Sequence, residues 1–487
     1  MRNSFGILFA VVMSLFISAG CGSGTDYSPT TTPVQPPSTS DTSGTGTGPE
    51  ATQPRPTATT YILPDQGSAP LPAKSIGSVT TPTASKSFAQ TGTANSTSKI
   101  LLNCTPHSYP QRTHRSLAVD PLNDNKIYIG VEQEGFFKTD DGGKTWERAV
   151  NGVKASDRTE GPGPCYEEFY STIIYPQYSD HICISMAGGP GTVGLANTIA
   201  GNNGVYCSVD GAESWVQRVS PDMNTAVYAL AADPTDFDTM YAGMNGGSCS
   251  NLPPVCEPET YFNTIGSVYK TTDGGLTWTE LNTLATRYVR VIVVRTHPLN
   301  PNWVIAATFS KVTVQGGGAG KFEESHQLGV IRSQDGGKTW TSSVNGMNPD
   351  PNEQALLGME ASPLNPSRLY VTASSNRSYL SSDWGQSFNP SRRMTAFVFD
   401  SFDTTGLHML GSNGESIQAS HDGGATWTII SATPGYISFD KGFPTTMVWS
   451  KNDANTVFLA GPYTSIYKSS NGGLTWSQLL SGDLLPK

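Results

Sequence analysis

The sequence predicts an all-β protein, a single seven-bladed β-propeller of four-stranded antiparallel blades preceded by a disordered linker. Two observations predict this class: one eight-residue box occurs seven times among 487 residues, and short hydrophobic strand patterns precede each copy. Each box has a hydroxyl residue, a carboxylate or amide two residues later, Gly or Ala two residues after that, and a final aromatic ring. The copies are TDDGGKTW (139–146), SVDGAESW (208–215), TTDGGLTW (271–278), SQDGGKTW (333–340), SSDWGQSF (381–388), SHDGGATW (420–427) and SSNGGLTW (469–476). Repetition of this kind is typical of propellers and related repeat architectures.

Each box is expected to form a tight turn between two strands. Its Asp or Asn accepts backbone N–H groups of the turn, and its glycines adopt the positive φ angles that other residues avoid. The closing aromatic ring is expected to pack between neighbouring blades. The acceptors are Asp141, Asp210, Asp273, Asp335, Asp383, Asp422 and Asn471. The boxes are therefore expected to be structural.

The box spacing divides residues 99–487 into seven blades of four strands each. Dipeptides such as Asp120-Pro121 and Ser362-Pro363 are expected to end the first strand of a blade. The predicted blades are 112–150, 168–220, 225–284, 287–345, 353–392, 395–431 and 442–480. Because each repeat packs only on its neighbours, such a domain can exceed the usual size of a single core.

The boxes resemble the Asp-box, or BNR, repeat of sialidases, xyloglucanases, sortilin-type receptors and photosystem II assembly-factor propellers. The resemblance implies that each box lies between the third and fourth strands of a blade, away from any active site. Specific functions do not transfer with it. The chain lacks the Arg-Ile-Pro segment of the sialidases and has one predicted propeller where these xyloglucanases have two.

Residues 1–21 resemble a bacterial lipoprotein signal peptide, with Arg2, an apolar run and a final Ser-Ala-Gly-Cys box. Cys21 would then carry the lipid, and Gly22 after it favours the outer membrane or cell surface. Plain secretion and an uncleaved anchor are the alternatives, although the apolar run is short for a membrane span. Residues 22–98, rich in Ser, Thr, Pro and Gly, are expected to form a disordered tether.

Six further cysteines indicate an exported protein with disulfides. They are Cys104, Cys165, Cys183, Cys207, Cys249 and Cys256. Fifteen pairings are possible. Cys183 and Cys207 fall on adjacent expected strands, Cys249 and Cys256 bracket a short loop, and the remaining two would pair with each other. The spacings lack the CxxC pattern of a zinc site, and neither a metal nor a cofactor is expected.

The end of the blades opposite the boxes is expected to carry the function. Its connections are long at 151–167, 187–204, 245–266 and 311–328 and short in the last three blades. Such asymmetry predicts a cleft or docking site. The carboxylates and aromatics expected on this face are Glu132, Glu134, Glu160, Tyr166, Glu167, Glu168, Tyr170, Tyr261, Phe262, Glu323, Glu324 and Glu415.

These observations favour a monomeric, lipid-anchored binding or assembly module that recognises a protein or a polysaccharide. The net charge of −10 argues against nucleic acid as a partner. The alternative is a glycoside hydrolase, which needs two carboxyls about 5–10 Å apart. Its candidate residues are Glu134, Glu167, Glu168 and Glu324. Solvated loop carboxylates would give the same pattern, so the sequence leaves the presence of catalysis open.

Overall fold

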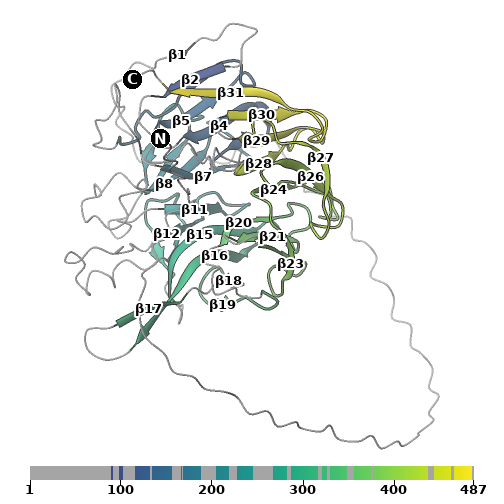
Figure 1. Ribbon diagram of the computed structural model, residues 1–487. Helices are drawn as coiled ribbons and strands as arrows, with labels where there is room; N and C mark the ends of the chain where they lie inside the picture. Colours follow the sequence, from purple (N-terminus) through teal and green to yellow (C-terminus); the bar gives the residue numbers. More distant parts are fainter. Residues whose placement is uncertain are drawn as a thin grey trace, which may run out of the picture. The chain divides into compact units, whose positions relative to one another are not determined.

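The computed structural model describes residues 89–90, 98–102, 116–131, 134–155, 166, 168–187, 204–218, 227–244, 267–281, 287–315, 321–325, 329–347, 356–373, 377–436, 444–461 and 465–484. These residues belong to one compact unit and form seven sheets, which are antiparallel except for the pairing of two strands in one of them (Figure 1). The predicted all-β class and the seven four-stranded blades are confirmed. Within these ranges, no helix is long and apolar enough to cross a membrane.

In every blade four strands, A to D, follow one another across the sheet in sequence order. Blade 1 contains β3 (Ala118–Asp120), β4 (Asn123–Val131), β5 (Gly135–Thr139) and β6 (Trp146–Arg148). Blade 2 contains β7 (Glu168–Ile174), β8 (Ile182–Ala187), β9 (Gly204–Ser208) and β10 (Val216–Gln217). Blade 3 contains β11 (Val227–Ala232), β12 (Met240–Met244), β13 (Val268–Thr271) and β14 (Thr279–Glu280).

The remaining blades keep the same order. Blade 4 contains β15 (Arg287–His297), β16 (Asn300–Gln315), β18 (Gly329–Ser333) and β19 (Thr341–Ser342), with β17 (Lys321–Ser325) added to β16. Blade 5 contains β20 (Leu356–Ala361), β21 (Leu369–Ala373), β22 (Arg377–Ser381) and β23 (Asn389–Arg392). Blade 6 contains β24 (Ala396–Phe399), β25 (Met409–Ser412), β26 (Ser416–Ser420) and β27 (Thr428–Ala432). Blade 7 contains β28 (Thr446–Trp449), β29 (Val457–Gly461), β30 (Ser465–Ser469) and β31 (Ser477–Leu484).

The core consists of seven apolar clusters, and each cluster is shared by two consecutive blades. B strands such as β12 and β29 are buried throughout because a neighbouring blade covers each of their faces. Box aromatics take part: the Trp215 ring of blade 2 lies edge-on against Phe136 of blade 1, with the ring centroids 5.3 Å apart. Ile129 of blade 1 and Phe458 of blade 7 share one cluster, which closes the ring of blades.

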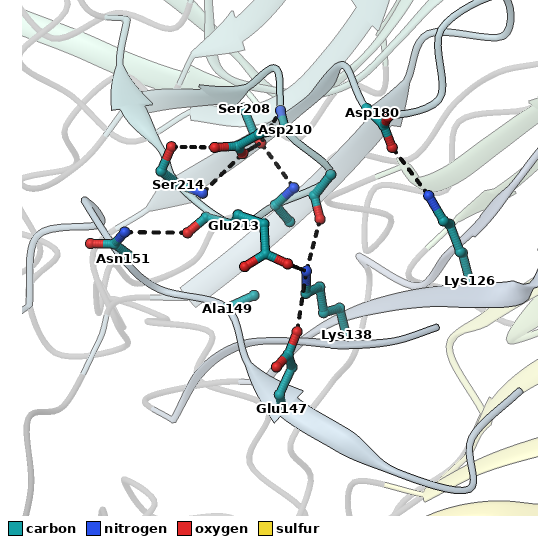
Figure 2. A network of polar contacts seen from close by, with 12 residues as sticks. Lys126, Lys138, Glu147, Ala149, Asn151, Asp180, Ser208, Asp210, Glu213 and Ser214 are labelled. Atoms are coloured by element: carbon teal, nitrogen blue, oxygen red, sulfur yellow. Dashed lines mark hydrogen bonds and ion pairs between the residues drawn. The ribbon is translucent and has the colours of Figure 1, made fainter. Parts of the chain in front are cut away.

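Polar contacts also join neighbouring blades. Figure 2 shows Lys138 of β5 reaching from blade 1 to the box of blade 2. Its ammonium lies 3.1 Å from Glu147, donates to the Gly211 carbonyl at 3.2 Å and pairs with Glu213. Burial disfavours the charged amine, but the hydrogen bonds to both glutamates outweigh it and raise the pKa of Lys138. A buried lysine, only 3% exposed, is thereby satisfied within the blade interface.

The two ends of the described chain meet at the junction of blades 7 and 1. Strand β2 (Ser98–Leu102) pairs in parallel with β31, and β1 (Ala89–Gln90) pairs with β6 (Figure 1). In addition, Asp124 of blade 1 accepts hydrogen bonds from Ser450 and Asn452 of blade 7. Residues 89–90 fall within the segment that is expected to be a tether, but their backbone pairs with β6, the last strand of blade 1. Side chains of blades 1 and 7 also pack together in one apolar cluster.

All seven boxes form the same turn. In blade 4, Asp335 Oδ1 accepts the Thr339 amide at 2.9 Å and Asp335 Oδ2 accepts the Thr339 hydroxyl at 2.6 Å. Asn471 replaces the carboxylate in blade 7, and its Nδ2 donates to the Thr475 hydroxyl. A backbone amide of every box also donates to the carbonyl at the end of the A–B turn in its own blade. Boxes and A–B turns therefore share one end of the blades, here called the lower end; the opposite end is the upper end.

The disulfide predicted between Cys183 and Cys207 is confirmed. The two residues are directly paired on β8 and β9, with their Cα atoms 4.1 Å apart. The bridge lies within the apolar cluster between blades 2 and 3. The lipidation residue Cys21 and the other expected disulfide residues lie outside the described residues. They are Cys104, Cys165, Cys249 and Cys256.

Candidate functional site

The A strands are the innermost strands, since A strands of consecutive blades contact one another. Near their upper ends, four consecutive blades carry the same irregularity. In blades 2 to 5 the pairing of strands A and B skips one residue of strand A, which is a β-bulge. The bulged residues are Tyr170, Tyr228, Ile292 and Leu357. The described pairing of blades 6 and 7 is continuous at this point.

The bulges of blades 2 and 3 bring two aromatic side chains together. The rings of Tyr170 and Tyr228 meet edge to face, with their centroids 4.4 Å apart. Tyr228 is 8% exposed, whereas Tyr170 and Leu357 are half-buried. A bulge redirects a side chain out of the regular alternation of a strand. The described side chains at these positions, those of Tyr170, Tyr228 and Leu357, are aromatic or apolar, and we call the four bulge positions of blades 2 to 5 the upper arc.

Blade 4 adds a hairpin above the upper arc, and this corrects the predicted loop at 311–328. Strand β16 continues to Gln315, pairs with β17 over 311–315 and with the start of β15 over 287–290. Residues 312–315 read Val-Thr-Val-Gln, an alternation that favours a strand, and the glycine-rich 316–320 favours a turn. The segment is therefore a three-stranded extension of the blade, and Glu323 and Glu324 lie on its β17 strand opposite Thr313 and Val312.

The structure describes the side chain of one of the four catalytic candidates. Glu134 is 0% exposed, and its Oε2 lies 3.2 Å from Nη2 of Arg148. The guanidinium of Arg148 in turn lies over the Phe137 ring, 5.3 Å from its centroid. A fully buried, ion-paired carboxylate is shielded from a substrate, so Glu134 fits a structural role in the connection between β4 and β5.

The other expected upper-face residues are dispersed. Glu168 begins β7, opposite Ala187 on β8, and Glu324 lies on the blade 4 hairpin. Tyr166 is buried beside Gly135, and its burial raises the pKa of its hydroxyl. Glu415 is exposed in blade 6, outside the blades that carry the upper arc. Five others lie outside the described residues, namely Glu132, Glu160, Glu167, Tyr261 and Phe262.

Sequence reasoning named Tyr170 but missed Tyr228, Ile292 and Leu357. The sequence did contain a signal. Each of the four residues follows directly after an apolar residue that is buried between two blades, and each lies near the start of the regular part of strand A. In the sequence these steps read Phe-Tyr-Ser, Val-Tyr-Ala, Val-Ile-Val and Leu-Leu-Gly. In the described part of the chain, no group of three or more His, Cys, Asp and Glu side chains is arranged to hold a metal ion. Of the upper-arc side chains that the structure describes, Tyr170 and Leu357 are partly accessible.

Comparison with known proteins supports the fold. Neither a family model nor a curated protein sequence matches the chain. An ancestral GH74 enzyme is similar, with a TM-score of 0.51 and 15% identity over 80% of this chain and 48% of that chain. The GH74 xyloglucanase from Xanthomonas campestris is similar with a TM-score of 0.40 and 15% identity, over 76% of this chain and 58% of that chain. The structure of YCF48 bound to D1 peptide is similar with a TM-score of 0.45 and 15% identity, over 77% of this chain and 99% of that chain. The chain spans about half the length of the GH74 structures, and at these identities the likeness extends to the propeller fold alone.

Proposed function

We propose that the chain is a binding or assembly module of the bacterial cell envelope that recognises a protein or glycan partner with the upper end of blades 2 to 5. The observation that carries the proposal is the run of four bulges at one position. Bulges are enriched beside functional sites, where they redirect a side chain. Four consecutive blades share this feature, and the hairpin of β16 and β17 extends one of them, blade 4, at its upper end.

The chemistry of the upper arc suits binding better than hydrolysis. Tyrosine supplies a large contact area at low entropic cost, and it is enriched among the residues that dominate binding energies at interfaces. A glycosidase instead requires two carboxyls facing one cleft. Glu134 is buried against Arg148, and Glu168 and Glu324 lie on strands of different blades. The envelope anchor rests on the sequence of residues 1–98, with Cys21 as the lipidated residue.

Two variants test the site. Replacing residues 312–325 with Gly-Ser-Gly removes β17 and the part of β16 that pairs with it, while Tyr170→Ala truncates the first residue of the upper arc. Ile429→Ser is the matched control, because Ile429 is an exposed apolar residue on the outer strand β27. Tagged full-length proteins are cross-linked in the native envelope, and the recovered protein and glycan are quantified. Loss of a central tyrosine contact should weaken binding about 30-fold.

The result has clear alternatives. Equal partner recovery by wild type and both upper-end variants would remove the site from this end of the blades. If wild type hydrolyses an envelope or plant polysaccharide and Glu168→Gln abolishes that activity, the chain is a glycoside hydrolase and the binding proposal is wrong. Melting temperatures of all variants are measured in parallel, so that loss of folding is separated from loss of binding.

A further inference from the structure

The lower end exposes apolar side chains at one repeated position, the third residue of the A–B turn. This residue is 61% exposed for Leu122, 76% for Leu299, 46% for Leu364 and 44% for Phe402. Tyr178, in the A–B turn of blade 2, is 50% exposed. Single exposed apolar residues are ordinary, but here five of the seven A–B turns carry one at the same end of the blades. We call these five side chains the lower apolar ring.

The turns hold these side chains in place. In blades 1 and 6 the first residue of the turn, Asp120 or Asp400, accepts the amide of Leu122 or Phe402 at 2.8 Å. The turns of consecutive blades also touch. Asn365 of blade 5 donates to the Thr405 carbonyl of blade 6 at 2.9 Å. The ring is thus pre-organised, which lowers the entropic cost of docking a partner on it.

Strong negative charge surrounds the lower apolar ring. The acidic residues of the A–B turns and boxes are Asp120, Asp124, Asp140, Asp141, Asp180, Asp210, Glu213, Asp233, Asp236, Asp238, Asp273, Asp335, Asp383, Asp400, Asp403, Asp422 and Asp453. The basic residues of the same turns are Lys126, Lys144, Lys338, Arg368 and Lys451. Lys138 and Lys270 also reach the boxes from neighbouring C strands, where Lys138 pairs with Glu213 and Lys270 donates to the Gly336 carbonyl at 3.3 Å, so they offset part of this charge. Lys126 already pairs with Asp180 at 3.1 Å. The Thr339 hydroxyl and amide lower the pKa of Asp335 to about 2, so its charge persists in mild acid.

We propose that the lower apolar ring is a second docking surface, and that its partner is a basic protein segment bearing apolar side chains. The charge decides between possible partners. Nucleic acids and anionic membrane surfaces are repelled by clustered carboxylates, whereas lysine or arginine side chains are attracted to them. The exposed leucines and Phe402 require apolar groups opposite, which a peptide with alternating basic and apolar residues supplies. This surface is independent of the upper arc, at the other end of the blades.

The test measures binding of a fluorescent peptide of about twelve alternating Lys and Leu residues, which carries both the basic and the apolar groups that the proposal requires. Wild-type protein is compared with the ring variant Leu299→Ser/Leu364→Ser/Phe402→Ser. The control variant is Val209→Ser/Leu276→Ser/Leu474→Ser, which changes three similarly exposed apolar residues in the box turns. We expect the ring variant to bind at least about tenfold more weakly, because three contacts are lost. The control and the blade 4 hairpin deletion should bind like wild type.

Charge is tested with the same assay. Binding should weaken as NaCl rises from about 50 to about 300 mM, because screening shortens the range of the attraction. An alternating Glu and Leu peptide and phosphatidylglycerol vesicles should not bind. The proposal is overturned if the ring variant binds as tightly as wild type, if the control variant loses as much affinity, or if either acidic probe binds equally well. Because the hairpin deletion affects only the upper end, failure here leaves the proposed function standing, and the reverse also holds.

Discussion

Trp278→Ala tests whether the box aromatics hold neighbouring blades together. Trp278 is 8% exposed and packs in the cluster between blades 2 and 3, and its Nε1 donates to the carbonyls of Arg218 and Gly275, both at 3.0 Å. Truncating such a ring costs about 3–5 kcal/mol, and the loss of its hydrogen bond across the blades adds roughly 1 kcal/mol. For residues 99–487 the unfolding entropy is about 0.8 kcal/mol/K, so the melting temperature should fall by about 5–7 °C.

Trp476→Ala is the matched control for this prediction. Trp476 occupies the same box position in blade 7 but is only partly buried, and its Nε1 donates within its own box, to Gly473 at 3.0 Å. It should therefore cost clearly less than Trp278→Ala. Differential scanning calorimetry and urea unfolding give both values. A Trp278→Ala protein that melts within about 1 °C of wild type, against the range expected for a buried ring, would refute the role of the box aromatics as inter-blade contacts.

The remaining predictions concern the disulfide, the boxes and the chain ends. Cys183→Ser should lower the unfolding free energy by about 3 kcal/mol, as reductant does to wild type, measured by urea titration. The pKa of Asp335 is about 2 in the folded chain, which is lower than in the unfolded chain. The ionised carboxylate therefore stabilises the fold at pH values above the pKa of the unfolded chain, and this stabilisation is lost as the pH falls towards 2. Asp335→Asn should reduce the acid dependence seen in urea unfolding across this range. Deleting 89–102, which contains β1 and β2, should increase amide exchange in β31 and β6, while deleting 30–43 should not. Cys21→Ser should move the protein from the membrane fraction to the soluble one, and retention in membranes would contradict lipidation.

The features that the sequence predicts well are those encoded within a few residues. Each box carries its own hydroxyl, carboxylate and glycine, so its turn forms from local hydrogen bonds wherever the chain places it. Ala212 and Trp384 stand where other boxes have glycine, and both still adopt a positive φ, of 68° and 53°. The turn thus tolerates substitution because several hydrogen bonds fix it at once. Seven such turns predict seven blades, and the predicted blade ranges contain the observed strands from β3 onwards except at the ends of β27 and β31, while β1 and β2 lie outside them.

The features that the sequence did not reveal depend on pairing between strands. A bulge is a mismatch between two strands, so no single residue such as Leu357 identifies it. It becomes visible only when the corresponding steps of several blades are compared. The pairing of β2 with β31 joins residues almost four hundred positions apart, and nothing near Ser98 or Leu480 indicates it. The hairpin of blade 4 differs, since the alternation of Val312 and Val314 before a glycine run was a local signal.

The two ends of the blades differ because the lower end repeats one hydrogen-bonded turn arrangement in every blade, whereas the upper end does not. At the lower end every blade repeats one box docked on one A–B turn, and four of these turns carry Leu or Phe at the same position. At the upper end the connections are free to vary, and the variation is concentrated in blades 2 to 5. A repetitive acidic and apolar surface and a one-sided aromatic surface suit different partners. If both proposals hold, the chain can hold two partners on opposite ends at once. Binding of the Lys and Leu peptide to protein already cross-linked at its upper end is then the measurement that separates an assembly module from a receptor with a single site.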